Sequence, residues 1–333
     1  MEDRAQQMSV QVFIPTFNRS AKLARAVESV LAQTAGDAEV VILDNHSEDD
    51  TPAVVAALMA ADPRITYVRR ERNIGMIANF NAIRSLVTAD FFCVLTDDDE
   101  YEPCFLETAL ACFGKDPRIR FVACNAPTLL HGEVVKSQLD AWQEGFYPAN
   151  TTVFKCLSGH YPLITNCLLR AETAGDFVFH EDLGNVGDGM LLTCLFCKYD
   201  AYISKVTTGS WNSDGENAST LLKADPALLV DTAIREARHY RAFCQKNGIV
   251  MRGLPMLWLK RFLTVLMAAD RSGFRHVREA SEMRRSFWPS TIAVLWILHQ
   301  LRVIRLFHKA LLLFRRLSLS WVARRGKAGL RHS

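Results

Sequence analysis

The first 125 residues alternate between short apolar runs and segments with apolar residues at helical spacing, and this pattern restricts the fold more than any other feature. The runs that predict strands are residues 10–15, 40–44, 65–68 and 91–95. A helix is predicted after each of them: the first has apolar residues from Leu23 to Leu31 and Ser20 as its N-cap, the second starts at Thr51, and the others span 76–87 and 103–115. Further strands are predicted at 119–124 and 163–170. Alternating strands and helices indicate an α/β sheet with parallel strands.

Polar residues gather where these predicted strands end. Residues 16–19 follow the first strand, Asp44 ends the second, residues 69–73 follow the third and residues 97–99 follow the fourth. In an open parallel sheet, ligands bind at the carboxyl ends of the strands. We therefore expect these residues to surround one ligand site.

The triplet Asp97, Asp98 and Asp99 is the most chemically specific part of that set. Adjacent carboxylates raise each other's pKa unless a cation or hydrogen-bond donors are present. Oxygen clusters of this kind suit Mg²⁺ or Mn²⁺. The alternative is a solvated acidic turn before the helix that begins near Pro103, but the position of the triplet at a strand end favours a metal.

Several classes of protein are excluded or disfavoured. No G-x-G-x-x-G follows the first strand and no G-x-x-x-x-G-K-[ST] occurs, so a dinucleotide enzyme or a P-loop ATPase is not expected. The nine cysteines show a single C-x-x-C, Cys194 and Cys197, inside an apolar helical segment, which indicates a reduced cytoplasmic compartment. The first residues lack an apolar stretch, so we expect no secretory signal.

The charge is distributed unevenly. Residues 283–333 contain 11 Lys or Arg and no acidic residue, which leaves residues 1–282 at −8 against +3 for the whole chain. The apolar run 291–298 is far shorter than the roughly 20 residues that cross a bilayer. Basic and apolar residues then alternate at helical spacing over 302–317. We expect residues 284–331 to bind an anionic membrane surface peripherally on the cytoplasmic face. The alternative is a helix that packs its apolar side on the rest of the protein. We expect no nucleic-acid partner.

Four blocks together resemble glycosyltransferase family 2. They are VFIPTFNR (12–19), VILDNHSEDDT (41–51), NIGMIANFN (73–81) and LTDDD (95–99), and their order and spacing match the family. The resemblance implies the GT-A fold, a mixed and mostly parallel sheet flanked by helices. It also implies a nucleoside diphosphate sugar donor, Mn²⁺ or Mg²⁺, and inversion at the anomeric carbon. The expected activity is transfer of a sugar to a hydroxyl of a glycan or lipid-linked acceptor in cell-surface polysaccharide synthesis.

The resemblance also implies roles for single residues. Thr16 and Phe17 would line the nucleotide pocket, with Phe17 stacking on the base. Asp44 would accept a hydrogen bond from the base or ribose, and Arg72 is a candidate contact of the diphosphate.

The acidic triplet matches the family's D-x-D motif in two registers. Counting back from Pro103 makes Asp98 the metal ligand and Asp97 the ribose contact. A literal D-x-D selects Asp97 and Asp99 instead. All three remain candidate metal ligands, and Asp97 is also a candidate nucleotide contact.

Asp188 matches the family's general base, although Gly187 stands where the family usually has Glu. As an alternative, Asp188 caps the helix that follows. Glu181 and Asp182 are the next candidates for the base. In the loop 211–219, which resembles the family's loop over the donor diphosphate, Asp214 either completes the metal shell or forms a turn before Gly215.

We expect a catalytic domain over residues 1–223 and a helical appendage over 224–333. The appendage has predicted helices at 228–247, 254–269, 277–286 and 292–322.

Two other functions are possible for a chain with this pattern. A sugar nucleotidyltransferase usually has a Gly-rich loop after the first strand, which residues 15–19 lack. A non-catalytic membrane-bound scaffold would not need the triplet and Asp188.

Overall fold

The computed structural model describes residues 8–35, 38–130, 133–157, 159–212 and 226–251. Asp214, the three predicted helices beyond residue 253 and the basic segment 284–331 lie outside the described residues. The chain divides into two compact units, residues 1–224 with 235–258 and residues 225–234 with 259–333. The elements described below lie in the first unit, except that the helix α8 (Pro226–Asn247) starts in the second. The domain boundary near residue 223 stays a prediction.

The main sheet has eight strands in the order β3-β2-β1-β4-β10-β6-β11-β9. Their bounds are β1 (Val10–Thr16), β2 (Glu39–Asp44), β3 (Ile65–Arg69), β4 (Phe91–Val94), β6 (Phe121–Asn125), β9 (Gly145–Tyr147), β10 (Cys167–Arg170) and β11 (Ala201–Thr207). Strands β1 to β4 are parallel to one another, and β6 is parallel to β11. Strand β10 runs antiparallel between β4 and β6. The sheet is therefore mixed and mostly parallel, as predicted.

A second sheet has four strands in the order β5-β12-β7-β8. They are β5 (Glu100–Tyr101), β7 (Pro127–Leu130), β8 (Glu133–Ser137) and β12 (Gly209–Asn212). None of these strands is apparent from hydrophobic periodicity, because each is short and only partly buried.

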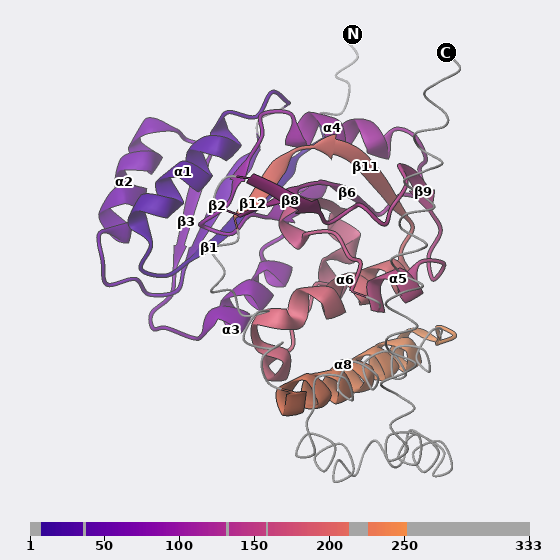
Figure 1. Ribbon diagram of the computed structural model, residues 1–333. Coiled ribbons are helices and arrows are strands. Elements are labelled where there is room, and N and C mark those ends of the chain that lie inside the picture. Colours follow the sequence, from indigo (N-terminus) through magenta and orange to yellow (C-terminus); the bar gives the residue numbers. More distant parts are fainter. Residues whose placement is uncertain (1–7, 36–37, 131–132, 158, 213–225, 252–333) are drawn as a thin grey trace. The chain divides into compact units, whose positions relative to one another are not determined.

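Helices cover both faces of the main sheet (Figure 1). The described α-helices in this unit are α1 (Ser20–Leu31), α2 (Thr51–Ala61), α3 (Met76–Asn81), α4 (Phe105–Phe113), α5 (Val153–Leu157) and α6 (Gly187–Lys198). One core packs α1, α2 and α4 against one face, and the other core packs α5 and α6 against the opposite face. Successive residues of a strand point to opposite faces, so Val12 and Ile14 enter the first core and Phe13 the second. This explains why the strands are apolar throughout.

Three local details differ from the prediction. The helix expected over 76–87 consists of α3 and the 3-10 helix η1 (Ala82–Ser85). The strand expected over 163–170 begins with the 3-10 helix η2 (Ile164–Asn166), in which the Thr165 carbonyl accepts a hydrogen bond from the Tyr101 hydroxyl (2.6 Å). Ser20 is the first helical residue of α1, and Arg19 occupies the cap position. Among the described helices, none combines the length and the apolar character that crossing a membrane requires.

Candidate functional site

The carboxyl ends of β1 to β4 meet at one edge of the main sheet. Thr16 is paired with Asp44, and Asp44 is paired with Arg69. Strand β4, which precedes the acidic triplet, pairs with the other side of β1. The expectation that the polar residues after these strands lie together is confirmed.

The loop after β1 presents Phe17 at this edge. Thr16 is buried, whereas Phe17 is 40% exposed and so accessible to a ligand. Asn18 has a positive φ of 53°, a conformation that Asn tolerates better than most residues. Its side chain accepts a hydrogen bond from the Glu48 backbone N–H (2.8 Å), and its own N–H donates to Ser47 Oγ (2.9 Å). These bonds hold the β1 loop against the β2 loop.

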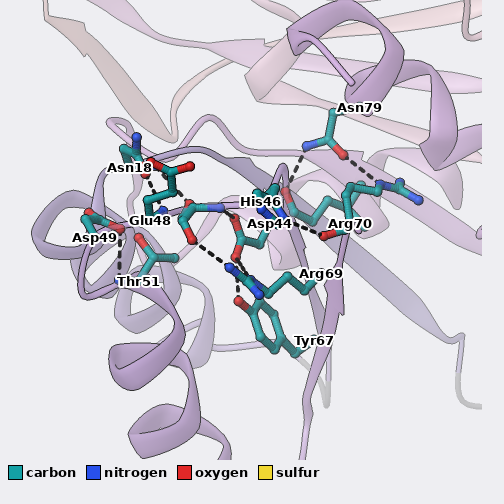
Figure 2. A network of polar contacts seen from close by, with 12 residues as sticks. Asn18, Asp44, His46, Glu48, Asp49, Thr51, Tyr67, Arg69, Arg70 and Asn79 are labelled. Carbon is teal, nitrogen blue, oxygen red and sulfur yellow. Dashed lines mark hydrogen bonds and ion pairs between the residues drawn. The ribbon is translucent and has the colours of Figure 1, made fainter. Parts of the chain in front are cut away.

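Asp44 is fully buried at the end of β2. The Tyr67 hydroxyl donates to its Oδ2 at 2.5 Å, Arg69 Nε lies 3.3 Å from the same oxygen, and the Ser47 N–H donates to Oδ1 at 2.8 Å (Figure 2). A buried carboxylate needs such partners to offset its lost hydration. In this conformation Asp44 therefore fixes the loop that follows it, and its oxygens are used inside the protein.

Two asparagines connect the β2 loop to the loop after β3. Asn45 Nδ2 donates to Asn73 Oδ1 (2.8 Å), and Asn45 Oδ1 accepts from the Ile74 N–H (2.9 Å). Gly75 has a φ of 87°, which side-chain-bearing residues rarely adopt, and its N–H donates to Asn73 Oδ1 (2.9 Å). Arg72 is exposed on this loop. The motif N-x-G thus builds a rigid turn beside the predicted nucleotide pocket.

Arg70 is a residue of this edge that the sequence reasoning did not select. Its Nε donates to Asn79 Oδ1 (3.2 Å), and Asn79 Nδ2 donates to the Leu43 carbonyl (2.8 Å), as Figure 2 shows. Its Nη2 is buried and has no hydrogen-bond partner among the described residues. Because residues 69–72 contain three arginines, the segment resembles a solvated basic face in the sequence, and the buried position of Arg70 Nη2 could not be predicted from it.

The acidic triplet divides into a pair and a single residue. Asp97 Oδ2 accepts from Thr16 Oγ1 (2.7 Å), and Asp97 Oδ1 lies 3.0 Å from Arg19 Nη1. The same Nη1 lies 2.9 Å from Asp98 Oδ2. Asp99 instead accepts from Thr96 Oγ1 (2.7 Å). Burial raises the pKa of Asp99 to about 6, and burial also raises the pKa of Asp97, although Thr16 and Arg19 act in the opposite direction.

Arg19 Nη1 allows a test of whether a metal ion suits the triplet. This nitrogen is a cation that touches an oxygen of Asp97 and an oxygen of Asp98, so the two carboxylates already converge on one point of positive charge. Their oxygens are the ligand type that Mg²⁺ and Mn²⁺ prefer. Within the described residues, no group of three or more His, Cys, Asp or Glu side chains is arranged to hold a metal ion. The pair fits an ion that keeps water or phosphate ligands, as Mg²⁺ usually does.

Asp188 lies in the first turn of α6, a helix that is otherwise mostly buried. Its Oδ1 accepts from the Gly189 N–H at 2.7 Å, and burial raises its pKa above the usual value of Asp. The ring of Tyr161 lies directly over Gly189, where a Cβ would come within 2.7 Å of Tyr161 Cε1. Asp188 is therefore the second residue of α6 and not its N-cap, and its carboxyl group holds its proton more strongly than an exposed Asp.

The two other candidate bases are exposed. They belong to the 3-10 helix η4 (Glu181–Val186). Asp182 Oδ1 lies 2.7 Å from His239 Nε2, and its carbonyl accepts from Arg235 Nη1 at 2.5 Å. The rings of His180 and His239 stack with centroids 3.6 Å apart. Asp182 therefore contacts two residues of α8, through its side chain and its carbonyl.

Residues 11–171 match the family model described as Glycosyl transferase family 2. The match covers 161 of the 333 residues, and over this segment the chain is similar to the family. One relative is the GalNAc(5)-diNAcBac-PP-undecaprenol beta-1,3-glucosyltransferase of Campylobacter jejuni, 36% identical over 92 residues, which are 27% of this chain and 30% of that protein. The matches span only 16% to 37% of the length of the first curated relatives.

Solved structures share the GT-A fold of this chain. S. aureus TarS 1–349 in complex with UDP-GlcNAc has a TM-score of 0.53 at 15% identity, covering 81% of this chain and 84% of that one. The mannosyltransferase PcManGT of Pyrobaculum calidifontis in complex with GDP-Man and Mn²⁺ also has a TM-score of 0.53, at 16% identity, covering 90% and 82%. At these identities the likeness establishes the fold.

Proposed function

We propose that this chain is an inverting glycosyltransferase that moves one sugar from a nucleoside diphosphate sugar to a hydroxyl of a glycan or lipid-linked acceptor, in cell-surface polysaccharide synthesis. The observation that carries the proposal is the convergence of Asp97 and Asp98 on one nitrogen at the carboxyl edge of β1 to β4. The family match and the nucleotide-sugar complexes of TarS and PcManGT support it.

The donor would lie along this edge. The exposed ring of Phe17 would stack on the base, and Asp97, oriented by Thr16, would accept from the ribose. Asp44 would contribute to the pocket through the loop that it fixes, and Arg72 would contact the diphosphate. Arg70, whose inward Nη2 has no partner among the described residues, is a further candidate for that contact.

Asp97 and Asp98 are the residues that would hold Mn²⁺ or Mg²⁺. Asp99 is bonded to Thr96, so a metal held by Asp98 together with Asp97 fits the geometry better than a literal D-x-D, which would use Asp97 and Asp99. When bound, the metal supplies positive charge that stabilises the departing diphosphate.

Asp188 would act as the general base. It would accept the proton of the acceptor hydroxyl while that oxygen bonds to the anomeric carbon and the bond to the diphosphate breaks. A general base typically contributes about 10²–10⁴-fold to the rate. A carboxyl group whose pKa is raised by burial is a stronger base than an exposed one. The reaction needs no protein nucleophile, because a single displacement inverts the configuration at the anomeric carbon.

A thermal-shift panel of UDP-, GDP-, ADP- and dTDP-sugars with Mn²⁺ tests the proposal, because a ligand that binds only the folded protein raises the melting temperature. We expect one base to be selected, with an effect that disappears in Asp98→Asn and persists in Asp99→Asn. Release of nucleoside diphosphate from that donor should follow. Binding without release would favour a scaffold, and pyrophosphate release from a nucleoside triphosphate with a sugar phosphate would favour a nucleotidyltransferase.

We further propose a peripheral position on the inner face of the cell membrane, through residues 284–331. This rests on the 11 cations and absent acids of residues 283–333. Each cation near an anionic surface contributes about 1 kcal/mol.

A further inference from the structure

Arg19 places a single nitrogen between the two carboxylates that would hold the metal. Nη1 lies 3.0 Å from Asp97 Oδ1 and 2.9 Å from Asp98 Oδ2. We infer that Arg19 is a displaceable counter-cation, which neutralises this pair in the absence of metal and moves to the donor's diphosphate when the metal enters. The inference rests on the proposed function, since it assumes a donor diphosphate at this edge.

The pair needs a counter-cation when no metal is present. The Asp97 side chain is only 7% exposed, and Asp98 beside it is 41% exposed. Two neighbouring carboxylates repel each other, and the buried one has lost most of its hydration. Leaving such a charge without its partner is costly. Arg19 therefore stabilises the metal-free protein.

The contacts of Arg19 suit a group that can leave. Its side chain is 48% exposed, and within the described residues its guanidinium contacts are these two carboxylates. An ion pair with an exposed partner contributes little to stability, so little is lost when it breaks. Thr16 bonds to Oδ2 of Asp97, whereas Arg19 uses Oδ1. Asp97 would thus keep its orientation after Arg19 leaves, and Oδ1 would become free.

The displaced guanidinium would remain close to the donor. Arg19 is at the cap position of α1, directly after β1, so its backbone stays at the carboxyl edge. A diphosphate that shares a metal with Asp97 and Asp98 would lie within reach of its side chain, and guanidinium groups bind phosphate with two parallel hydrogen bonds. Metal and diphosphate should therefore bind cooperatively, each raising the affinity of the other by the same factor.

Mn²⁺ binding to the full chain tests this, measured by the loss of the free-ion electron paramagnetic resonance signal. We expect Arg19→Gln to bind Mn²⁺ alone about fivefold more tightly than the natural protein, because no ion pair has to break. At saturating Mn²⁺, the same variant should bind UDP or GDP, whichever the natural protein selects, about tenfold more weakly by calorimetry.

Arg25→Gln is the matched control, since it removes the same charge from α1 one and a half turns away. Arg25 lies 3.7 Å from Glu100, and both are exposed. We expect it to change neither affinity by more than about twofold. The inference is overturned if Arg19→Gln binds Mn²⁺ no better than the natural protein, if Arg25→Gln reproduces its effect, or if neither protein binds Mn²⁺. In the first two cases, the proposed function stands if the natural protein still binds nucleotide in a Mn²⁺-dependent way. If the natural protein binds no nucleotide at all, both the inference and the proposed function are wrong.

Discussion

Asn81 forms two hydrogen bonds with the backbone of Phe179, a residue 98 positions further along the chain. Its Nδ2 donates to the Phe179 carbonyl (2.8 Å), and its Oδ1 accepts from the Phe179 N–H (2.8 Å). Asn81 is the last residue of α3, the helix that follows the Asn73 loop at the carboxyl edge of the sheet. Phe179 precedes the segment that leads to Asp188. One amide group therefore joins the two parts of the proposed active site.

Asn81→Ala should lower turnover more than donor binding. Without the amide, the segment before Asp188 loses two bonds, and a base displaced by about 1 Å can cost up to about a hundredfold in rate. We expect a turnover loss of about tenfold or more, with the donor KM within about twofold and a stability loss of about 1–3 kcal/mol. Steady-state kinetics and urea unfolding measure these. Asn247→Ala, which removes a local bond to Phe243, is the control, and unchanged turnover in Asn81→Ala would contradict the coupling.

Asp188→Asn should abolish the acid limb of the pH–rate profile. A base works only when deprotonated, and burial raises the pKa of Asp188. Turnover should therefore fall as the pH drops through a value above the ordinary Asp pKa of about 3.9. The Asn variant should be at least about a hundredfold slower at neutral pH, with donor affinity retained. Near-normal turnover in a folded variant would transfer the role to Glu181 or Asp182, whose Gln and Asn variants are made in parallel.

Gly189→Ala should disturb the base through Tyr161. The added Cβ would lie 2.7 Å from Tyr161 Cε1 and 2.8 Å from Cζ, so the ring or the helix start must move. We expect a stability loss of about 1–3 kcal/mol and reduced turnover. Gly175→Ala, at which a Cβ meets nothing within 4 Å, is the control.

A double-mutant cycle with Tyr161→Ala identifies the cause. If the clash is responsible, the pair should show a favourable coupling of about 0.5–3 kcal/mol, because removing the ring makes room for the methyl group. Additive losses would show that Gly189 is needed for a different reason.

The basic segment should attach the protein to anionic liposomes in a salt-dependent way. The full chain should float with phosphatidylserine-containing vesicles at low salt and detach at high salt, because screening weakens the attraction. Truncation at about Ser290 should remove the binding. No flotation of the full chain, or aggregation of the truncated protein, would indicate that the apolar side of this segment packs on the rest of the protein instead.

The strands β1, β2 and β4 were predictable because they are buried on both faces and therefore almost continuously apolar, as Phe91 to Val94 illustrate. The strand β11 was missed, since its exposed second half, including Lys205, interrupts the apolar pattern. For the candidate site, the sequence predicted which polar residues follow the strands but not their partners. The contact of Arg19 with the triplet joins residues 78 and 79 positions apart, and the enclosure of Asp44 depends on Tyr67 from the neighbouring strand. Such pairings depend on tertiary packing, which no local pattern encodes.

Strand β10 is the single element through which the two halves of the main sheet are hydrogen-bonded. Its Leu169 is paired with Phe92 of β4 on one side and with Phe121 of β6 on the other. The strands β1 to β4 come from residues 10–94, whereas the strands beyond β10 come from residues 121–207. A chimera that exchanges the strands beyond β10 has to preserve these pairings of Leu169, the pairing of β5 with β12 and the bonds of Asn81 to Phe179. Such an exchange would leave β1 to β4 and the acidic triplet after β4 in place.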